Sequence, residues 1–385
     1  MLDDVEWGEY RLGDLFDIDN TWIYGKNKQW KTRFLEKSNN RLPVISGVTI
    51  NNGINYYTED QPNEDELFSD SLTISTRGEY SGTVTYHEGE FVLANNILVM
   101  TMPNLNKEQK LFIGTIINNL NYGGYNNYPR IETLKNDKIY LPVYKGKIDF
   151  DFMEKFVTKL EEQGIIKLNE YLLEEGLNNY DLTSEEQEFV GYTDNCDINL
   201  LINKKLKEID WNEYRIGDLF DRIKTNKLPY KAKELPNAPT NKYILPCLTS
   251  SFMNQGLNYY APKENATVLK NVISIPSNSD VYRAYFQSRD FTVLSDAYAI
   301  HWKDNDMNIT PNQYLFMVLC INKVTDLPIY SYKNKLGGWN VVKNKHILLP
   351  QTNGKIDFDF MEKIISILKK LAIKDVVLYA DEKVK

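Results

Sequence analysis

The sequence predicts an α+β fold in which two tandem, β-rich domains are each followed by a long helix. Three observations predict it: the chain repeats one plan twice, the middle of each copy has the composition of strands, and each copy ends in an amphipathic segment. The chain has 385 residues, of which 42% are hydrophobic and 25% charged, so it can bury several cores. Disorder, collagen and a continuous coiled coil are therefore excluded.

The repeat runs along nearly the whole chain. Four segments recur in the same order, and the last of them is ten identical residues long. At first and second occurrence they are WGEYRLGDLFD and WNEYRIGDLFD (7–17, 211–221), GINYY and GLNYY (53–57, 256–260), GGYN and GGWN (123–126, 337–340), and GKIDFDFMEK (146–155, 354–363). The interval between copies varies, so loops of different length separate fixed anchors.

The middle of each copy is predicted to be sheet. Stretches rich in β-branched and aromatic residues alternate with Gly and Asn, as at 71–75, 82–86 and 91–93 in the first copy. The second copy has similar stretches at 272–275 and 291–294. A helix is predicted from Pro311, because Thr310 is a good N-cap and Pro suits the first helical position; its counterpart is expected at 106–118.

Each copy then ends in a predicted helix that begins near the shared DFDFME. An apolar stripe at helical spacing includes Phe152, Phe156 and Leu160 in the first copy, and Met361, Ile364 and Leu368 in the second. We expect the two helices to pack against one another, antiparallel, and to hold the domains apart. The alternative is that each helix packs only on its own domain.

These patterns divide the chain into four expected regions. They are a first β-rich domain at 1–148, a helix and acidic connector at 149–207, a second β-rich domain at 208–355 and a second helix at 356–385. No apolar run is long enough to span a bilayer and the first residues are acidic, so we expect a cytoplasmic protein. Cys196, Cys247 and Cys320 fit no metal or disulfide spacing.

No recognisable catalytic constellation is present. His87, His301 and His346 are not spaced as metal ligands, and the glycine motifs that hold dinucleotides or nucleoside triphosphates are missing. The Asn-Pro-Pro-aromatic tetrapeptide of adenine methyltransferases is missing too. Carboxylate pairs at Asp149 and at Asp357 recur where a helix starts, and capping explains them. We therefore expect no catalytic residue and no metal site in this chain.

The charge is unevenly distributed along the chain. The formal net charge is −8, yet residues 221–350 carry 16 Lys and Arg against nine Asp and Glu. Residues 141–220 carry nine Lys and Arg against 18 Asp and Glu. The basic segment indicates an anionic partner, and the acidic connector indicates a solvated or protein-facing surface.

Basic and aromatic residues interleave with Asn in the predicted loops. Lys and Arg bind phosphates and guanine, and Asn and Gln bind adenine, so these loops indicate DNA recognition; a solvated surface is the alternative. Candidates in the first copy are Lys26, Lys28, Trp30, Lys31, Arg33, Arg77, Tyr80, Tyr125 and Arg130. Those in the second copy are Lys224, Lys227, Lys231, Lys233, Lys242, Arg283, Tyr285, Arg289, Lys333, Lys335 and Trp339.

The repeated plan resembles the specificity (S) subunits of restriction-modification systems. The resemblance lies in the opening W-x-x-Y-R-[L/I]-G-D-L-F, a variable middle, a Gly-Gly-aromatic-Asn, and a Leu-Pro at 141–142 and 349–350 that precedes a helix. It covers almost the whole chain. After the Leu-Pro, the sequence departs from the usual type I pattern and is more similar to type IIB and related subunits.

The resemblance implies a non-catalytic subunit with two target recognition domains that reads both halves of a bipartite site in double-stranded DNA. Its two spacer helices would dock modification (methyltransferase) subunits, which carry or are joined by the restriction subunit. S-adenosylmethionine and Mg2+ are expected on those partners and no cofactor is expected in this chain. The family's base contacts lie in variable loops, so the candidates above depend on charge and position alone.

Two other functions remain open from the residues. One is a duplicated β-rich hydrolase acting on carbohydrate, with aromatic side chains lining sugar subsites. The other is a binding protein of the same architecture that inhibits another restriction system.

Overall fold

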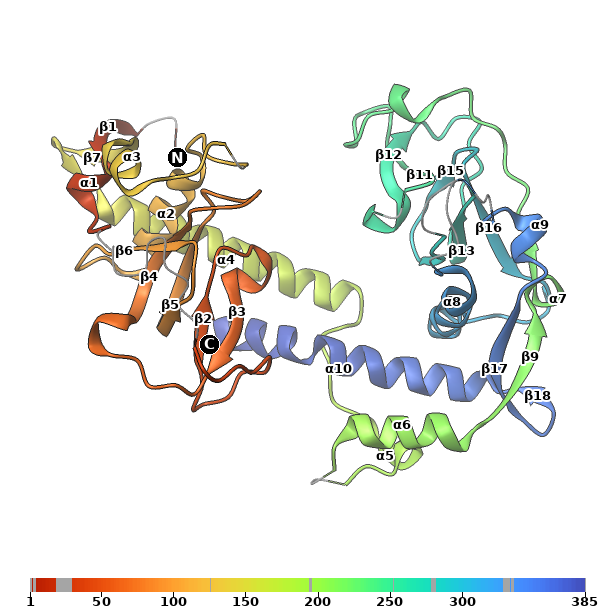
Figure 1. Ribbon diagram of the computed structural model, residues 1–385. Helices are drawn as coiled ribbons and strands as arrows, with labels where there is room; N and C mark the ends of the chain where they lie inside the picture. The colour runs from red at the N-terminus through yellow and green to blue at the C-terminus, as the bar shows by residue number, and fades with distance from the viewer. Residues whose placement is uncertain are drawn as a thin grey trace. The chain divides into compact units, whose positions relative to one another are not determined.

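The computed structural model describes residue 2 and residues 5–18, 30–124, 126–193, 196–251, 253–277, 282–327, 333 and 336–384. These residues form two compact units, Met1–Glu170 and Tyr171–Lys385 (Figure 1). Both contain sheets and helices, which confirms the predicted α+β class. In the described part of the chain, no helix combines the length and apolar character needed to cross a bilayer.

The first unit is built on two sheets. Their strand orders are β1-β7-β8 and β3-β2-β5-β4-β6; β2 and β5 are parallel, and the other pairs are antiparallel. The strands are β1 (Glu6–Arg11), β2 (Leu42–Ile45), β3 (Ile54–Thr58), β4 (Leu67–Ser75), β5 (Val84–Leu93), β6 (Ile97–Met100), β7 (Lys138–Tyr144) and β8 (Lys147–Ile148). The helices are α1 (Leu12–Leu15), η1 (Ile50–Gly53), η2 (Glu64–Glu66), α2 (Lys107–Asn118), α3 (Ile131–Asn136) and α4 (Phe150–Glu174), which continues into the second unit.

The second unit repeats this plan with a divided central sheet. Its strand orders are β18-β17-β9, β10-β16-β13-β14 and β12-β11-β15. The strands are β9 (Asp210–Arg215), β10 (Phe220–Arg222), β11 (Leu245–Leu248), β12 (Leu257–Ala261), β13 (Val272–Pro276), β14 (Tyr285–Gln287), β15 (Thr292–Val293), β16 (Ala297–Trp302), β17 (His346–Thr352) and β18 (Lys355–Ile356). The helices are α5 (Ser184–Val190), α6 (Ile198–Glu208), α7 (Ile216–Leu219), η3 (Ala232–Glu234), η4 (Met253–Gly256), α8 (Pro311–Thr325), α9 (Trp339–Val342) and α10 (Phe358–Val384).

The opening motif and the Leu-Pro pair with each other in both units. Trp7 in β1 lies opposite Pro142 in β7, and Trp211 in β9 lies opposite Pro350 in β17. The two copies therefore share the same antiparallel register, although their offsets in sequence differ. Each copy brings its start beside its end, so the variable middle is inserted between fixed strands.

The repeated glycine of the opening motif allows a close approach of two segments. A Cβ added to Gly13 would lie 2.8 Å from the Lys135 carbonyl oxygen, and one added to Gly217 would lie 2.9 Å from that of Lys343. The Gly217 N–H donates to the Lys343 carbonyl at 2.8 Å. Only glycine fits such a contact without displacement of the backbone.

The repeated decapeptide forms a hairpin and the first turn of a helix. Asp149 Oδ1 accepts the backbone N–H of Phe152 at 2.9 Å, and Asp357 Oδ1 accepts that of Phe360 at 2.8 Å. Both aspartates thus cap the helix that follows, as the sequence pattern predicts. Their recurrence is explained by structure and gives no support for catalysis.

The glutamate of the decapeptide ties this helix to the preceding one. Glu154 Oε2 accepts a hydrogen bond from Asn106 Nδ2 at 2.7 Å, which joins α4 to the N-cap of α2. Glu362 accepts from Asn312 Nδ2 at 2.7 Å and from the Thr310 hydroxyl, which joins α10 to the start of α8. We call the paired strands, the hairpin and this helix contact the joint of each unit.

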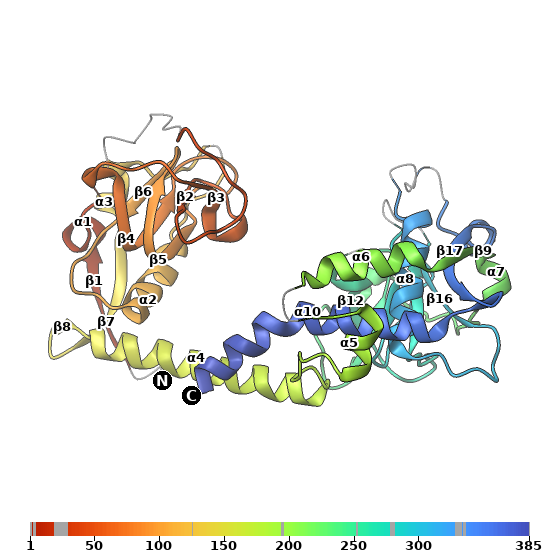
Figure 2. The same cartoon turned by 90° about the horizontal axis from the view of Figure 1, so that it is seen from below.

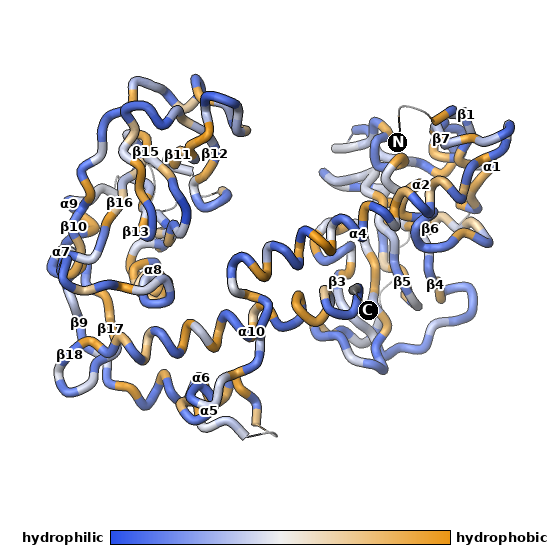
Figure 3. Tube along the Cα trace, turned by 180° about the vertical axis from the view of Figure 1, so that it is seen from behind, coloured by the Kyte–Doolittle hydropathy of each residue, from blue (hydrophilic) through white to orange (hydrophobic). Residues whose placement is uncertain are grey.

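Each unit has its own main core. The methionine of the decapeptide is fully buried in both, as Met153 and Met361, among the apolar faces of α2 and α8 and the strands of the joint. Along α4 and α10, hydrophobic and hydrophilic residues alternate (Figure 3). The helix predicted from Pro311 is confirmed, with the Thr310 Oγ1 accepting the Gln313 N–H at 3.2 Å.

The central sheets differ between the units. β5 is a single strand of ten residues, whereas its counterpart is divided into β14 and β15. In the first unit the Thr73 hydroxyl lies 2.8 Å from His87 Nε2, and in the second Gln287 Nε2 donates to Ser274 Oγ at 3.0 Å. The two pairs are equivalent, because Thr73 lies opposite Thr85 and Ser274 opposite Tyr285, each two residues before the partner. Burial lowers the pKa of His87 to about 4.

The acidic connector is helical, which the sequence analysis does not predict. Thr183 caps α5, and α5 and α6 run beside α10 (Figures 1 and 2). Glu186, which is buried, accepts hydrogen bonds at 2.6 Å from Ser366 Oγ and from Lys370 Nζ on α10. Burial opposes ionisation of Glu186, but these bonds outweigh it and lower its pKa.

Candidate nucleic-acid interface

Three loops of the first unit meet at one end of the β2–β3 hairpin. The first is the hairpin tip at residues 46–53, where a Cβ on Gly47 would lie 2.9 Å from Ser75 Oγ and 3.0 Å from the Asn96 carbonyl oxygen. The second follows β4, and its Thr76 N–H donates to that Asn96 carbonyl at 2.9 Å. The hairpin tip and the β4–β5 loop therefore form one surface.

The third loop holds the Gly-Gly of the repeat. The Gly124 N–H donates to the Glu79 carbonyl at 3.1 Å, and Ser81 Oγ donates to the Gly124 carbonyl at 3.1 Å. Arg77 and Tyr80, both predicted contacts, lie exposed in the β4–β5 loop, with Tyr80 57% exposed. The structure therefore brings these two candidates beside the hairpin tip.

In each unit a tyrosine packs against a glycine where the second and third loops cross. In the first unit a Cβ on Gly82 would lie 2.3 Å from the Tyr122 Cβ. In the second unit a Cβ on Gly337 would lie 1.6 Å from Tyr282 Cδ1. Each crossing thus combines one ring with one residue that has no side chain, but the ring comes from opposite loops.

Arg130 lies further along the chain, at the N-cap of α3. Its guanidinium is 5.4 Å from the centre of the Tyr128 ring, and its Nη2 donates to the Tyr128 hydroxyl at 3.3 Å. Arg130 is exposed, so it stays in the proposed contact set.

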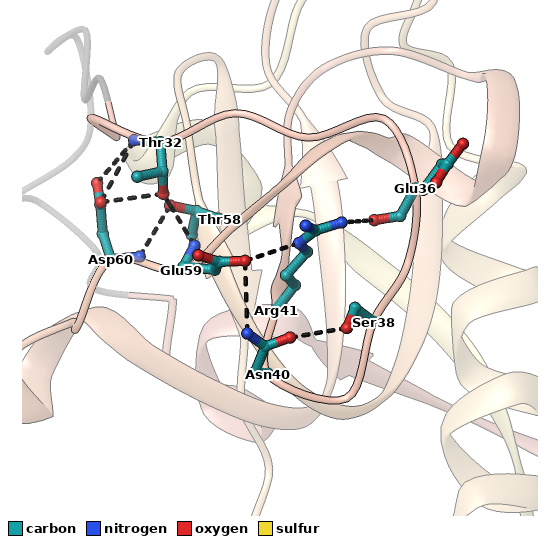
Figure 4. Close-up of polar contacts among 8 residues, drawn as sticks. All are labelled: Thr32, Glu36, Ser38, Asn40, Arg41, Thr58, Glu59 and Asp60. Carbon is teal, nitrogen blue, oxygen red and sulfur yellow. Dashed lines mark hydrogen bonds and ion pairs between the residues drawn. The ribbon is translucent and has the colours of Figure 1, made fainter.

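Two further candidates, Lys31 and Arg33, lie near the open end of the same hairpin, where β2 starts and β3 ends. Figure 4 shows the polar contacts at this end. Arg41 Nε donates to Glu59 Oε1 at 3.0 Å, and Thr32 Oγ1 donates to Asp60 Oδ1 at 3.0 Å. The Lys31 backbone N–H also donates to Asp60. These candidates are thus separated from the hairpin tip by the length of β2 and β3.

The carboxylates at the open end lie beside basic groups and partly neutralise them. Burial opposes ionisation of Asp60, but hydrogen bonds from Lys31 and Thr32 outweigh it and lower the pKa of Asp60. The side chains of Lys31 and Arg33 remain exposed, and the Arg33 guanidinium lies 4.8 Å from the centre of the Tyr56 ring. Both can reach a phosphate without breaking an ion pair.

Trp30 is a core residue, which argues against its predicted DNA contact. The side chain is 5% exposed and packs with Val44, Tyr56 and Val92. Its Nε1 donates to the Leu93 carbonyl at 3.0 Å. Because the ring is enclosed and its donor is used, we remove Trp30 from the proposed contacts. Four further candidates, Lys26, Lys28, Tyr125 and Lys335, lie outside the described residues.

The second unit presents a more basic surface. Five predicted lysines are exposed, and no carboxylate of the described residues lies within 4.0 Å of their ammonium groups. They are Lys224, Lys227, Lys231, Lys233 and Lys242. Lys333 is also exposed. Such groups can neutralise phosphates at little desolvation cost.

The two predicted arginines of this unit are committed to carboxylates. Arg283 Nη2 lies 2.7 Å from Asp326 Oδ2, just after α8, and Arg289 forms an ion pair with Glu175. Their charges are therefore partly cancelled within the unit. Sequence spacing could not reveal this, because the partners are 43 and 114 residues away.

The two predicted aromatic contacts of this unit are half-buried. Tyr285 lies in β14, and burial raises its pKa. Trp339 packs against the core with its ring centre 6.1 Å from that of Tyr298. Neither ring is available for stacking on a base without rearrangement, so they are weaker candidates than the exposed lysines.

The stripe residues of the long helices fall into two groups. Phe152 and Phe156 contact Phe112 edge to face, and Met361 and Ile364 are buried in the core of the second unit. These four side chains pack on their own unit, which agrees with the alternative prediction that each helix packs only on its own domain. Leu160 and Leu368, one turn further along, are 52% and 37% exposed.

The described residues contain no group of three or more His, Cys, Asp or Glu side chains that could hold a metal ion. Cys247 and Cys320 are buried, and burial raises the pKa of both thiols to about 12. They are therefore protonated and unreactive at neutral pH.

Comparisons with known proteins agree with this architecture. The chain is 21% identical over 365 residues to the "Type II restriction enzyme BgcI specificity subunit S.BcgI" of Heyndrickxia coagulans, covering 93% of each chain. Its fold is similar to the crystal structure of the type I restriction-modification system S subunit from M. genitalium, with a TM-score of 0.55 and 12% identity over 99% of this chain and 92% of that one.

The family model for the type I restriction modification DNA specificity domain matches residues 4–170 and 208–378, which are the two copies of the repeat. Members of this family are specificity subunits, which are not catalytic by themselves. The chain therefore belongs to the family of type I restriction modification DNA specificity domains, which it contains twice.

Proposed function

We propose that this chain reads a bipartite DNA target for a restriction-modification complex, one half-site with each unit. The observation that carries the proposal is the duplication of one scaffold with the same joint and different loops. A rigid scaffold that holds variable loops suits recognition of different sequences. Two such scaffolds in one chain suit two half-sites.

Binding and discrimination come from different side chains in this proposal. Exposed lysines and arginines neutralise phosphates and set the register on the duplex, so affinity falls as salt rises. Loop side chains contact base edges in the grooves and discriminate between sequences. The lysines of the second unit then supply more of the salt-dependent affinity than the first unit does.

The long helices are the proposed docking elements for modification subunits. Leu160 and Leu368 are exposed at equivalent positions, and apolar side chains in this setting are suited to a protein interface. We further propose that α4 and α10 pack antiparallel and fix the gap between half-sites. The partners would supply S-adenosylmethionine-dependent methylation and Mg2+-dependent cleavage, all in the cytoplasm.

The test is co-expression with the modification subunit encoded by the same host, followed by sequencing of methyladenine in the host DNA. We expect methylation at one bipartite motif only when both proteins are present. If both proteins are made in folded form and neither associate nor methylate DNA, the proposal is wrong.

A further inference from the structure

The tip of the β2–β3 hairpin and the tip of the β11–β12 hairpin share an uncommon backbone. Asn51, Asn52 and Gly53 have φ values of 49°, 50° and 79°. Their equivalents Asn254, Gln255 and Gly256 have φ values of 47°, 53° and 86°. Each tip is thus three consecutive residues in the left-handed region, which side chains other than Gly and Asn disfavour.

The surrounding chain holds both tips in place. The Ser46 N–H donates to the Gly53 carbonyl at 3.0 Å, and the Thr249 N–H donates to the Gly256 carbonyl at 3.3 Å. The side chain of Gln287 donates to the Gln255 carbonyl at 3.2 Å. The left-handed backbone is therefore part of the folded scaffold.

The backbone alone does not explain the side chains found there. Asn51 and Asn52 tolerate a positive φ. A glutamine in this backbone conformation is less stable than a glycine, so the backbone does not account for Gln255. The amides of Asn52 and Gln255 are exposed, and their side chains make no hydrogen bond to the described residues. A residue kept against its backbone preference suggests a role for its side chain.

The residue that precedes the three left-handed residues of each tip has a large, exposed apolar side chain. Ile50 is 76% exposed and Met253 is 63% exposed, and the two are equivalent in the repeat. Exposure of an apolar side chain at one position of one loop needs no explanation, but here it recurs two residues before an exposed amide side chain in both units.

We propose that the two tips are the base-reading elements, with Asn52 and Gln255 as matched specificity residues, a proposal that depends on the proposed function. A two-stranded hairpin fits the major groove, and Asn and Gln pair with adenine through its N6 and N7 atoms. Ile50 and Met253 lie where an apolar side chain contacts a thymine methyl group. Arg77 and Tyr80, beside the first tip, contact the adjoining backbone.

The test replaces each amide by glycine in the full chain, co-expressed with its modification subunit. Asn52→Gly and Gln255→Gly remove the side chain and also relieve the left-handed backbone, so both variants should fold at least as stably as the parent chain. We expect each variant to lose discrimination at one adenine of one half-site by about tenfold or more, with the other half-site unchanged. Methyladenine sequencing and competition binding with base-substituted duplexes measure this.

The matched controls are Asn104→Gly and Asn353→Gly, which are exposed asparagines with φ values of 66° and 52° outside the two tips. They should leave the motif unchanged. If the parent chain directs methylation normally and both tip variants keep its full specificity, the inference about the tips is wrong and the proposed function stands. If the parent chain directs no methylation, the proposed function fails first. Thermal unfolding confirms folding. If a glycine variant does not fold, Asn52→Asp or Gln255→Glu replaces it at the same position, because each keeps the shape of the side chain but loses its N–H donors.

Discussion

The joints of the two units are the same in every contact compared, whereas the sheets and loops between them are not. Register, glycine contact, helix cap and glutamate bridge recur in both joints. The central sheet is continuous in the first unit and divided in the second, and the exposed charge differs as well. The difference shows that the same joint supports two different central sheets, so the fold of each unit depends on the joint more than on the middle.

The largest expected effect concerns the connector, which packs on the long helix of the second unit. Lys370→Ala should reduce the free energy of unfolding by about 3 kcal/mol, because the buried Glu186 carboxylate loses its cationic partner and keeps only neutral donors, among them Ser366. Glu162→Ala, at the equivalent position of α4, is exposed and should have almost no effect. Urea unfolding of both variants measures the contrast, and equal losses would contradict it.

The histidine of the first unit should make that unit sensitive to acid. Burial lowers the pKa of His87 from 6.5 to about 4, so the folded state binds fewer protons than the unfolded state between these values. Its stabilising contribution is complete above pH 6.5 and is lost as the pH falls towards 4, by roughly 3 kcal/mol in total.

The second unit supplies the matching variant. His87→Gln introduces the residue found at the equivalent position, Gln287, and should remove most of this pH dependence while keeping a bond to Thr73. Urea unfolding at pH 7 and pH 5 compares the two proteins. If the free energy of unfolding falls between pH 7 and pH 5 by the same amount in both proteins, other groups cause the acid sensitivity.

Alanine substitution of the repeated glycine tests whether the two joints contribute equally to the free energy of unfolding. Gly13→Ala and Gly217→Ala should each cost about 1–3 kcal/mol, because the new Cβ meets backbone in both units. Gly164→Ala, within α4, meets nothing within 4 Å and should stabilise by about 1 kcal/mol. Differential scanning calorimetry gives the three values. A large difference between the first two would show that the joints are not interchangeable.

The smallest effect is on the salt dependence of DNA binding. The double variant Lys231→Ala, Lys233→Ala should lower the slope of log K against log salt by about 2, since each phosphate contact contributes about 0.9. The double variant Arg283→Ala, Arg289→Ala should lower it less, because Asp326 and Glu175 already neutralise those arginines. Fluorescence titration at several salt concentrations measures both slopes. If the lysine double variant has the same slope as the parent chain, these lysines do not contact DNA.

Much of the fold could be predicted because the joint is repeated in sequence as well as in space. The capped helix starts and the helix from Pro311 follow from local patterns that occur twice. The strand registers of the joint were not predicted, because pairing between segments more than 100 residues apart leaves no local pattern. The connector helices are not predicted although Thr183 and Glu186 form a capping box, because an acidic segment also fits a solvated connector without regular structure.

The site was harder to predict because charge in sequence does not report pairing in space. Trp30 stands beside lysines in the sequence but lies in the core, and the carboxylates that pair with Arg283 and Arg289 are distant along the chain. Asn52 and Gln255 carry no charge and match no motif. Only their backbone angles and exposure, which need the structure, distinguish them.

The contact between a tyrosine and a glycine at each loop crossing limits which loops can be exchanged between the two units. Moving the 76–83 loop alone from the first unit into the second would place Gly82 opposite Gly337 and leave a hole, and the reverse transfer would set Tyr282 against Tyr122. A viable graft must carry both loops together. The whole insert between the two strands of the joint is therefore one structural module.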